Sequence, residues 1–324
     1  MQERIDETPA PVNLEEWEVL ARQRLPRTVY DYYAGGAGDE VAVRANRWAF
    51  QRLGLRPRVL VDVSCIDTGI ELFGERLAHP VLLAPTAFQR LADPDGEVAT
   101  ARAAQATGTL LVASTMSTCA IEEIAAEAGP LWFQLYVFRD RGLTRALIQR
   151  AEEAGARALC LTVTVPVQGN RERDARNHFR LPAELEMANF RGLRQAGLAV
   201  GAGSELEGFI SREFDPTLSW TIVDWLRATT RLPLLLKGVM VGEDARLALE
   251  HGVDGVIVSN HGGRQLDVAE PTARALPYVA DAIEGRIPVL MDGGVRSGSD
   301  VVKALALGAR AVMIGRPYLW GLAV

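Results

Sequence analysis

The sequence predicts a (β/α)8 barrel, and three observations lead to that fold class. Beyond Pro80 the chain contains eight short apolar runs, most of them followed by a helical pattern. Runs that are apolar throughout, rather than alternating, are typical of parallel strands buried on both faces. No G-x-G-x-x-G fingerprint of a dinucleotide-binding sheet follows an early strand. An open doubly wound sheet stays possible, because periodicity cannot show that a sheet closes.

The eight expected strands follow one another along most of the chain. They cover residues 80–87, 110–115, 131–136, 158–163, 233–239, 255–260, 288–294 and 311–316. Helical patterns are expected over residues 96–107, 120–128, 142–154, 243–250 and 300–307. In residues 142–154 the apolar side chains recur at helical spacing, which predicts one buried face.

Two regions fall outside this repeat. Residues 1–79 contain an expected helix over Leu14–Leu25 and an aromatic segment that ends at Gly35-Gly36. Residues 167–217 form a long polar insertion after the fourth strand, which would lie over the active-site face of a barrel. After the eighth strand only residues 317–324 remain, so we expect the last helix to be truncated. The chain therefore reads as one barrel domain over residues 1–324.

Composition excludes several classes of protein but identifies no chemistry. The chain has 324 residues, 48% hydrophobic and 23% charged, with a net charge of −6. Its apolar content suits a large core, no run approaches the roughly 18 apolar residues of a membrane span, and the acidic N-terminus lacks a secretory signal. The acidic balance argues against a nucleic-acid partner. Cys65, Cys119 and Cys160 are too few and scattered for a disulfide framework or a thiolate metal site, so we expect buried thiols in a cytoplasmic protein without a metal.

Polar or small residues stand at the ends of the expected strands, where barrel enzymes carry their functional groups. These residues are Pro85, Thr86, Ala87, Ser114, Gln134, Tyr136, Thr162, Lys237, Ser259, His261, Asp292, Gly293, Gly294, Val295, Arg296, Gly315 and Arg316. Hydroxyl and amide groups beside one lysine suit a large heteroaromatic ligand. The glycine turns with Arg296 and Arg316 predict the phosphate site that barrels form after strands seven and eight, although ordinary turns with surface arginines would read alike.

Two further groups indicate acid–base chemistry on an anionic substrate. Lys237 closes an apolar strand, so it either meets an anionic or electron-rich ligand or extends to the barrel rim. His261 is the only histidine at a strand end and is our candidate general base. Arg264 could bind a carboxylate beside it. A loop histidine that merely caps the next helix is the alternative.

At these motifs the sequence resembles the FMN-dependent 2-hydroxy-acid oxidase/dehydrogenase family, which includes glycolate oxidase, lactate oxidase and mandelate dehydrogenase. The matching stretches run in order and include Tyr30-Asp-Tyr-Tyr33, Ala84-Pro-Thr-Ala87, Phe133-Gln-Leu-Tyr136, Ser259-Asn-His-Gly-Gly-Arg-Gln-Leu-Asp267, Asp292-Gly-Gly-Val-Arg296 and Gly315-Arg-Pro317. The resemblance implies that FMN lies at the barrel mouth against the strand-end residues from Pro85 to Arg316 given above. It also implies that Lys237 lies near the flavin N1–O2 edge, and that the enzyme is a tetramer.

For the substrate, the resemblance implies an (S)-2-hydroxy acid. Its carboxylate would meet Tyr32, Arg171 and Arg264, its hydroxyl would meet Tyr136, and His261 would take a proton as electrons pass to the flavin. Oxygen or another acceptor would then reoxidise the flavin, and Ala87, where some dehydrogenases carry glycine, favours oxygen.

The chain departs from the family at two positions. The family usually has Asp where this chain has Thr164, and a second arginine where it has Asn170. A threonine hydroxyl can orient an imidazole but supplies no negative charge to stabilise its protonated form. We therefore expect reduced or altered reactivity, and a catalytically weakened or repurposed FMN-binding barrel stays an alternative. A non-catalytic flavin-binding scaffold and a different enzyme on the same barrel, such as an isomerase, are further alternatives.

Two apolar residues bear on substrate choice. Met116 stands where glycolate oxidases tend to carry tryptophan, and Phe88 is expected on the same side. An apolar pocket with a flexible thioether suits a larger, mandelate-like side chain. The alternative is that both residues only pack the loops.

Overall fold

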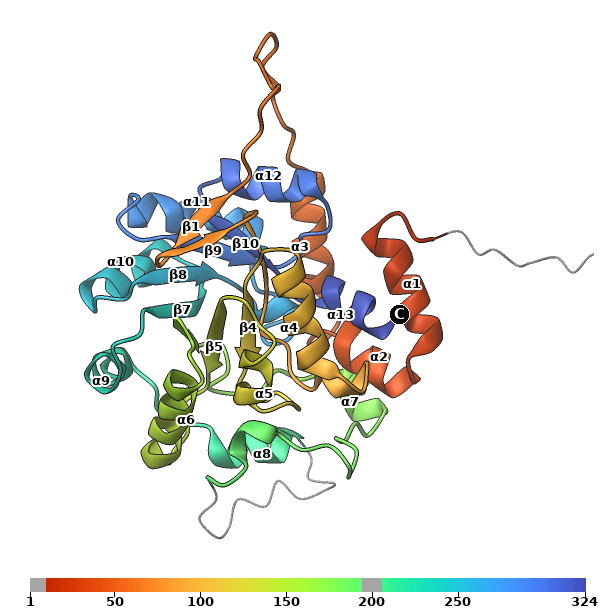
Figure 1. The fold of residues 1–324 in the computed structure, drawn as a ribbon, viewed down its shortest axis with the longest axis vertical. Helices are drawn as coiled ribbons and strands as arrows, with labels where there is room; N and C mark the ends of the chain where they lie inside the picture. The colour runs from red at the N-terminus through yellow and green to blue at the C-terminus, as the bar shows by residue number, and fades with distance from the viewer. Residues whose placement is uncertain (1–9, 194–205) are drawn as a thin grey trace, which may run out of the picture.

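A computed structural model describes residues 10–193 and 206–324 and contains the predicted closed barrel (Figure 1). The barrel strands are β3 (Val81–Leu83), β4 (Leu111–Ser114), β5 (Leu131–Leu135), β6 (Leu159–Thr162), β7 (Leu234–Val239), β8 (Gly255–Val258), β9 (Val289–Asp292) and β10 (Ala311–Ile314). All neighbours are parallel, and β10 pairs with both β9 and β3. This closure decides against the open sheet and confirms the predicted fold class.

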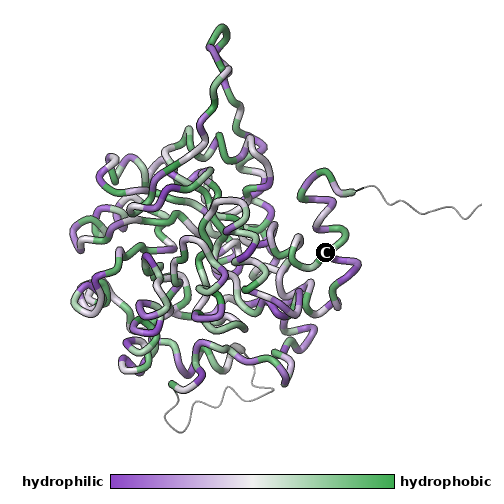
Figure 2. The backbone as a smooth tube through the Cα atoms, viewed as in Figure 1, coloured by the Kyte–Doolittle hydropathy of each residue, from purple (hydrophilic) through white to green (hydrophobic). Residues whose placement is uncertain are grey.

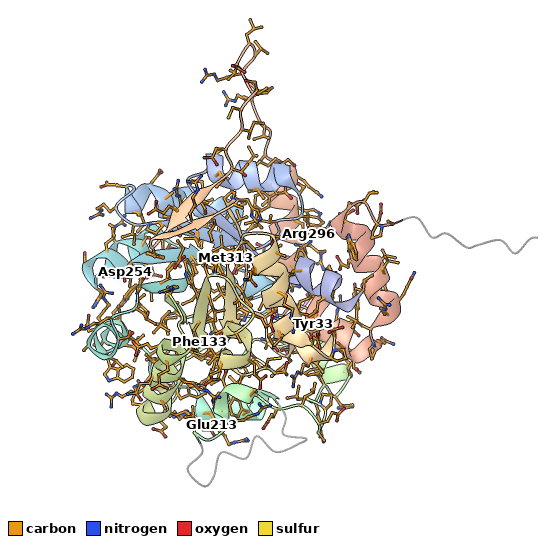
Figure 3. All side chains as sticks on the ribbon, viewed as in Figure 1. Tyr33, Phe133, Glu213, Asp254, Arg296 and Met313 are labelled. Carbon is orange, nitrogen blue, oxygen red and sulfur yellow. The ribbon has the colours of Figure 1, made fainter. Side chains whose placement is uncertain are left out.

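The core divides into two layers because strand side chains alternate between the faces of the sheet. Inward residues such as Met313 fill the barrel, whereas outward residues such as Phe133 pack beneath the surrounding helices (Figure 3). The helices after the strands are α4 (Gly96–Ala106), α5 (Ile121–Ala125), α6 (Arg141–Glu153), α9 (Thr221–Thr229), α10 (Gly242–Glu250), α11 (Thr272–Ile283) and α12 (Gly298–Ala306). The β–α alternation read from the sequence is therefore present throughout.

The N-terminal segment is more ordered than the sequence analysis expected. The predicted first helix is α1 (Leu14–Arg24), and α2 (Arg27–Ala34) contains the aromatic segment. A third helix, α3 (Val41–Gln51), and a hairpin of β1 (Ile70–Leu72) and β2 (Glu75–Leu77) were not anticipated. Ile70 and Leu77 belong to the same apolar cluster as the barrel interior, so the hairpin covers its N-terminal end.

Residues 52–69, between α3 and the hairpin, form an arm that projects from the barrel (Figure 1). Hydrophobic and hydrophilic residues are mixed along it (Figure 2). Val59, Leu60, Val63 and Ile66 are strongly exposed. Cys65 is also exposed, so its expected burial is wrong, whereas Cys119 and Cys160 are buried as predicted. The sequence of this arm, in which valines are mixed with charged residues, does not indicate that Cys65 is exposed.

The insertion after β6 and the end of the chain contain further helices. The insertion includes α7 (Glu172–Arg176), η2 (Ala188–Phe190) and α8 (Leu206–Glu213), while its residues 194–205, like residues 1–9, lie outside the described part. The residues after β10 form α13 (Arg316–Ala323), which packs against α1. Among the described helices none is long and apolar enough to cross a membrane.

Candidate functional site

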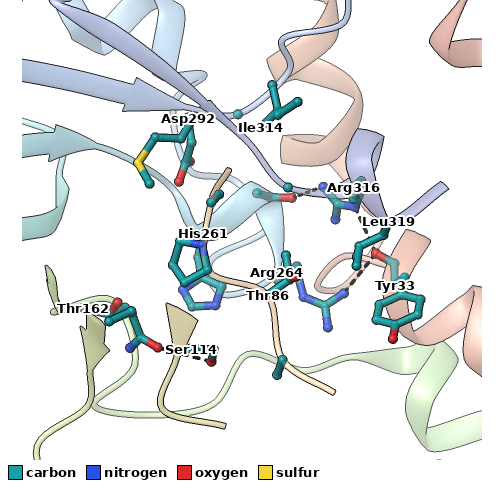
Figure 4. Close-up of a pocket in the computed structure, with 18 of the residues that line it drawn as sticks. Tyr33, Thr86, Ser114, Thr162, His261, Arg264, Asp292, Ile314, Arg316 and Leu319 are labelled. Carbon is teal, nitrogen blue, oxygen red and sulfur yellow. Dashed lines mark hydrogen bonds between the residues drawn. The ribbon is translucent and has the colours of Figure 1, made fainter. Parts of the chain in front are cut away.

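A cavity opens at the C-terminal mouth of the barrel, and its empty space is about 1140 Å³ when the open solvent at the entrance is included. Of the predicted cofactor residues it is lined by Pro85, Thr86, Ala87, Ser114, Gln134, Thr162, Lys237, Asp292, Gly293, Gly294, Val295, Arg296, Gly315 and Arg316. Of the predicted substrate and catalytic residues it is lined by Tyr32, Met116, Tyr136, Arg171, His261 and Arg264. Figure 4 shows how His261, Arg264, Thr162 and Asp292 surround this space.

Three predicted residues do not line the cavity. Ser259 is fully buried beneath it. Phe88 is 1% exposed and packs behind Tyr32, with ring centroids 5.9 Å apart. Thr164 contacts the cavity only through His261. Each of these side chains therefore acts on residues that line the site.

The strand-end polar residues converge because each lies two positions after an inward core residue. Thr162 follows the buried Cys160 on β6, and Lys237 follows Leu235 on β7. The strand register pairs Thr162 with Lys237 directly. Since alternate residues share one face of a strand, these side chains extend the inward rows upward. The result is a polar layer on top of an apolar one.

Lys237 is buried in an ion pair rather than extended to the rim. Its Nζ lies 2.6 Å from a carboxylate oxygen of Asp292 and donates to Ser259 Oγ at 2.8 Å. Ser259 in turn donates to Asp292 at 2.7 Å. Both charged side chains are below 10% exposed, so desolvation would make either charge costly without its partner.

His261 occupies a strained position next to this pair. It begins the turn η3 (His261–Gly263) with a φ of 57°, a left-handed conformation that costs a non-glycine residue about 1–3 kcal/mol. Its Nδ1 lies 2.8 Å from Thr164 Oγ1, and its backbone N–H donates to Ser259. Burial lowers the pKa of His261 well below its ordinary range, and the cations Lys237 and Arg171 lower it further. The imidazole is therefore neutral and able to accept a proton.

Arginines give the cavity an excess of positive charge. Burial and the neighbouring Arg264 lower the pKa of Arg171 to about 10 and that of Arg316 to about 9. Arg264 and Arg316 also hold the end of α2, because both donate to the carbonyl oxygen of Gly35 at 2.9 Å. Buried cations with only one carboxylate among the residues that line the cavity, Asp292, predict anionic ligands.

The turn after β9 lines the cavity and packs so closely against α3 that glycine is required there. Gly293 and Gly294 have φ values of 99° and 86°, and a Cβ on Gly294 would lie 2.3 Å from the carbonyl oxygen of Asn46. No side chain caps the N-terminus of α13, whereas Ser297 and Asp300 cap α12. The free N–H groups that can bind a phosphate are therefore those at Gly315 and in the first turn of α13.

Several cavity residues were missed by sequence reasoning. They are Tyr33, Ala84, Val165, Ile210, Gly262, Met313, Ile314, Pro317 and Leu319. Ile210 comes from α8, in the insertion whose structure the sequence pattern did not resolve. Tyr33, next to the predicted Tyr32, donates from its hydroxyl to the carbonyl oxygen of Phe88. The apolar residues gave no local signal, because tertiary packing rather than a sequence pattern brings them to the mouth. The described residues contain no group of three His, Cys, Asp or Glu side chains that could hold a metal ion.

Comparisons with known proteins give one consistent result. The family model described as FMN-dependent dehydrogenase matches residues 21–324. L-lactate oxidase of Nostoc sp. is 49% identical over 321 residues, covering 97% of this chain and 88% of the relative. Glycolate oxidase of Spinacia oleracea is 49% identical over 312 residues, covering 96% and 85%. A crystal structure of mandelate oxidase with (S)-4-hydroxymandelic acid is 46% identical, with a TM-score of 0.91, and covers 97% of this chain and 88% of that one.

Proposed function

Because this chain belongs to the FMN-dependent dehydrogenase family and is an FMN-dependent 2-hydroxy-acid oxidase or dehydrogenase, we propose that it oxidises aromatic (S)-2-hydroxy acids with oxygen as acceptor. The observation that carries the proposal is the meeting of His261, Tyr136, Arg171 and Arg264 in one cavity. Neutral base, phenol and cations together suit a molecule with a hydroxyl beside a carboxylate. The isomerase alternative is thereby disfavoured.

The residues at the mouth fit FMN. Gln134 Nε2 and Arg296 Nε are buried there without a hydrogen-bond partner in the described structure. A heteroaromatic ring with acceptor edges would satisfy the amide, and a phosphate would satisfy the guanidinium. The uncapped N-terminus of α13 provides N–H groups for the same phosphate, and Gly293 and Gly294 line the cavity with it. Lys237 would face the ring edge where negative charge develops.

The proposed reaction assigns a role to each side chain around the substrate. Bound FMN accepts the two electrons that leave the substrate's α-carbon and delivers them to the final acceptor. Arg171 and Arg264 bind the carboxylate, with Tyr32 beside them, and Tyr136 donates to the hydroxyl oxygen. In the proposed tautomer the neutral ring carries its proton on Nδ1, beside Thr164 Oγ1, so that Nε2 is free to take the substrate proton.

Apolar residues on the substrate side support an aromatic substrate. Met116, Val165 and Ile210 line the cavity and are each at most 6% exposed. In the test, Met116→Trp fills part of this space. We expect it to lower kcat/KM for mandelate relative to glycolate by about 10–200-fold, the usual value of steric discrimination in an apolar pocket. An unchanged ratio would show that Met116 only packs the loop.

The activity itself is tested by anaerobic mixing of the holoenzyme with (S)-mandelate, lactate and glycolate. We expect the visible flavin absorption to bleach, fastest with mandelate. Bleaching with glycolate but not mandelate would overturn the aromatic assignment. A yellow protein that no hydroxy acid bleaches would instead favour the catalytically weakened or repurposed barrel, for which Thr164 is the reason.

The electron acceptor, the oligomeric state and the cellular location are three further proposals. Oxygen as acceptor, favoured by Ala87 in the cavity wall, predicts hydrogen peroxide in equal amount to the 2-oxo acid. Peroxide-free turnover that needs an added dye would contradict it.

We propose a homo-oligomer, a tetramer by family resemblance. The proposal is supported by the arm at residues 52–69, which exposes the apolar side chains of Val59, Leu60, Val63 and Ile66. A cytoplasmic location is supported by the free, exposed Cys65, which a reducing compartment would preserve.

A further inference from the structure

The loop that carries His261 is held from outside the barrel. Its residues His261, Gly262 and Gly263 all have positive φ, at 57°, 65° and 75°. Three consecutive left-handed residues do not persist without external contacts. Those contacts come largely from α3, in the N-terminal segment.

Asn46 on α3 makes the central contact with this loop. Its Nδ2 donates to Asn260 Oδ1 at 2.9 Å, and Asn260 Nδ2 donates back to Asn46 Oδ1 at 2.9 Å. Asn260 Oδ1 also accepts from the backbone N–H of Gly263, which closes the turn at 3.2 Å. Asn46 is 2% exposed, so water cannot replace these bonds cheaply.

The same asparagine contacts the turn that we assign to the phosphate. Its Oδ1 accepts from the backbone N–H of Thr272 at 3.2 Å, at the start of α11, where Pro271 offers no side-chain cap. Its carbonyl oxygen lies against Gly294, and its Nδ2 lies 3.2 Å from where a Cβ on Gly293 would stand. One side chain and its backbone therefore touch the elements after β8 and after β9.

Two further hydrogen bonds hold the start of α3, and in both of them the loop residue Asp267 is the acceptor. Asp267, at the end of the motif that contains His261, accepts from the backbone N–H of Asp39 at 2.9 Å and so supports the start of α3. The backbone N–H of Ala42 donates to the carbonyl oxygen of Asp267 at 2.8 Å. The helix and the loop thus fix each other at both ends of their contact.

We propose that Asn46 is a positioning residue that holds the His261 loop and the Gly293-Gly294 turn in fixed relation, so that base and phosphate site are aligned by the N-terminal segment. The base half of this inference rests on the proposed function. The phosphate half rests only on FMN binding.

The test replaces Asn46 by leucine, which removes three hydrogen bonds while keeping a side chain of the same branched shape and number of heavy atoms. We expect the dissociation constant of FMN, measured by fluorescence titration of the apoprotein, to rise by about tenfold or more. We also expect the acid limb of kcat/KM to move to higher pH, because a loosened loop admits water to His261 and relieves its desolvation. The charges that face His261, on Lys237, Arg171, Arg264 and Arg316, are unchanged in this variant.

A matched control separates positioning from stability. Thr144, fully buried near the start of α6, accepts from the backbone N–H of Phe138, and Thr144→Val leaves that group unpaired at a place where neither residue lines the cavity. We expect a lower melting temperature with unchanged FMN affinity and an unmoved acid limb. If Asn46→Leu behaves in the same way, Asn46 is only a core residue and the proposal fails.

Two further outcomes remain decisive. If Asn46→Leu does not fold, Asn46→Ser, which is smaller and keeps a hydroxyl, must still weaken FMN binding, and unchanged affinity there overturns the proposal. If the unaltered protein turns over no hydroxy acid, the proposed substrate is wrong, yet the FMN titration still tests Asn46.

Discussion

The strands of the barrel carry apolar side chains at its N-terminal end and polar or charged side chains at its mouth. At the N-terminal end the inward residues include Leu235 and Ile257, both fully buried among apolar neighbours beneath the β1–β2 hairpin. Two positions further along the same strands come Lys237 and Ser259, which share hydrogen bonds and an ion pair with Asp292. A residue that packs in the apolar interior and a residue that can take part in chemistry therefore lie only two positions apart on the same strand.

The mouth carries buried charge that the apolar inward residues at the other end lack. Lys237 is buried, and His261 is held at positive φ among cations. Such strain and desolvation cluster at functional sites because pre-organised groups act on a ligand without further rearrangement.

The largest expected effect comes from β8 and the loop that follows it. His261→Asn removes the base, so we expect the rate of flavin reduction by mandelate to fall about 10³-fold with unfolding stability nearly unchanged. Ile257→Val, on the strand below, should instead cost about 0.5–1.5 kcal/mol of stability and leave the rate alone. Rapid mixing and urea unfolding of both variants measure the contrast. An Ile257→Val variant with slow flavin reduction and normal unfolding stability would contradict the distinction between the two ends of the barrel.

The pH response is the next largest. His261 works as a base only when neutral, and because its pKa is lowered, turnover should persist well below pH 6.5. The unfolded chain binds a proton near pH 6.5 that the folded chain does not, so stability falls as pH drops from about 6.5 toward the folded pKa. Urea unfolding of the apoprotein across this range measures the slope. His261→Asn should flatten it, and an equal slope in that variant would assign the effect to another group.

The barrel and most of its mouth could be predicted because strands buried on both faces appear as continuous apolar runs, and these runs end in polar or small residues. An apolar run that ends in Lys237 or Asp292 announces the inward polar layer directly. Arg171 and Tyr32, outside any strand, were found only through family resemblance. Their cavity position depends on an insertion and an N-terminal helix whose placement no periodicity encodes.

Other features were beyond sequence reasoning for physical reasons. Ile210 lines the cavity from α8, and the position of that helix over the mouth depends on tertiary packing rather than on a local pattern. Asn46 looks like any polar residue on an amphipathic helix until Asn260 and Gly294 are seen against it. Long-range partners of this kind, separated by 214 positions in sequence for the two asparagines, leave no local pattern.

A smaller effect is expected where the mouth departs from its family. Thr164→Asp places a carboxylate at the Nδ1 side of His261, which raises the pKa of the imidazole and stabilises it once protonated. We expect flavin reduction to quicken by about tenfold and the acid limb to move to higher pH. Rapid mixing with Thr164→Asn as the uncharged control measures this. A rate that is unchanged, or raised equally by Thr164→Asn, would refute the role of charge.

The smallest effect concerns the three thiols, whose alkylation reports which parts of the folded protein a reagent can reach. Burial raises the pKa of Cys160, two positions below Thr162 on β6, to about 12, and burial together with Glu97 raises that of Cys119 to about 11. Since the thiolate is the reactive form, iodoacetamide should alkylate only the exposed Cys65 in the folded protein, with turnover unchanged. Mass spectrometry of labelled peptides measures this, and Cys65→Ser should abolish the label. Labelling of Cys160 under native conditions would mean that the apolar layer beneath the mouth opens to solvent.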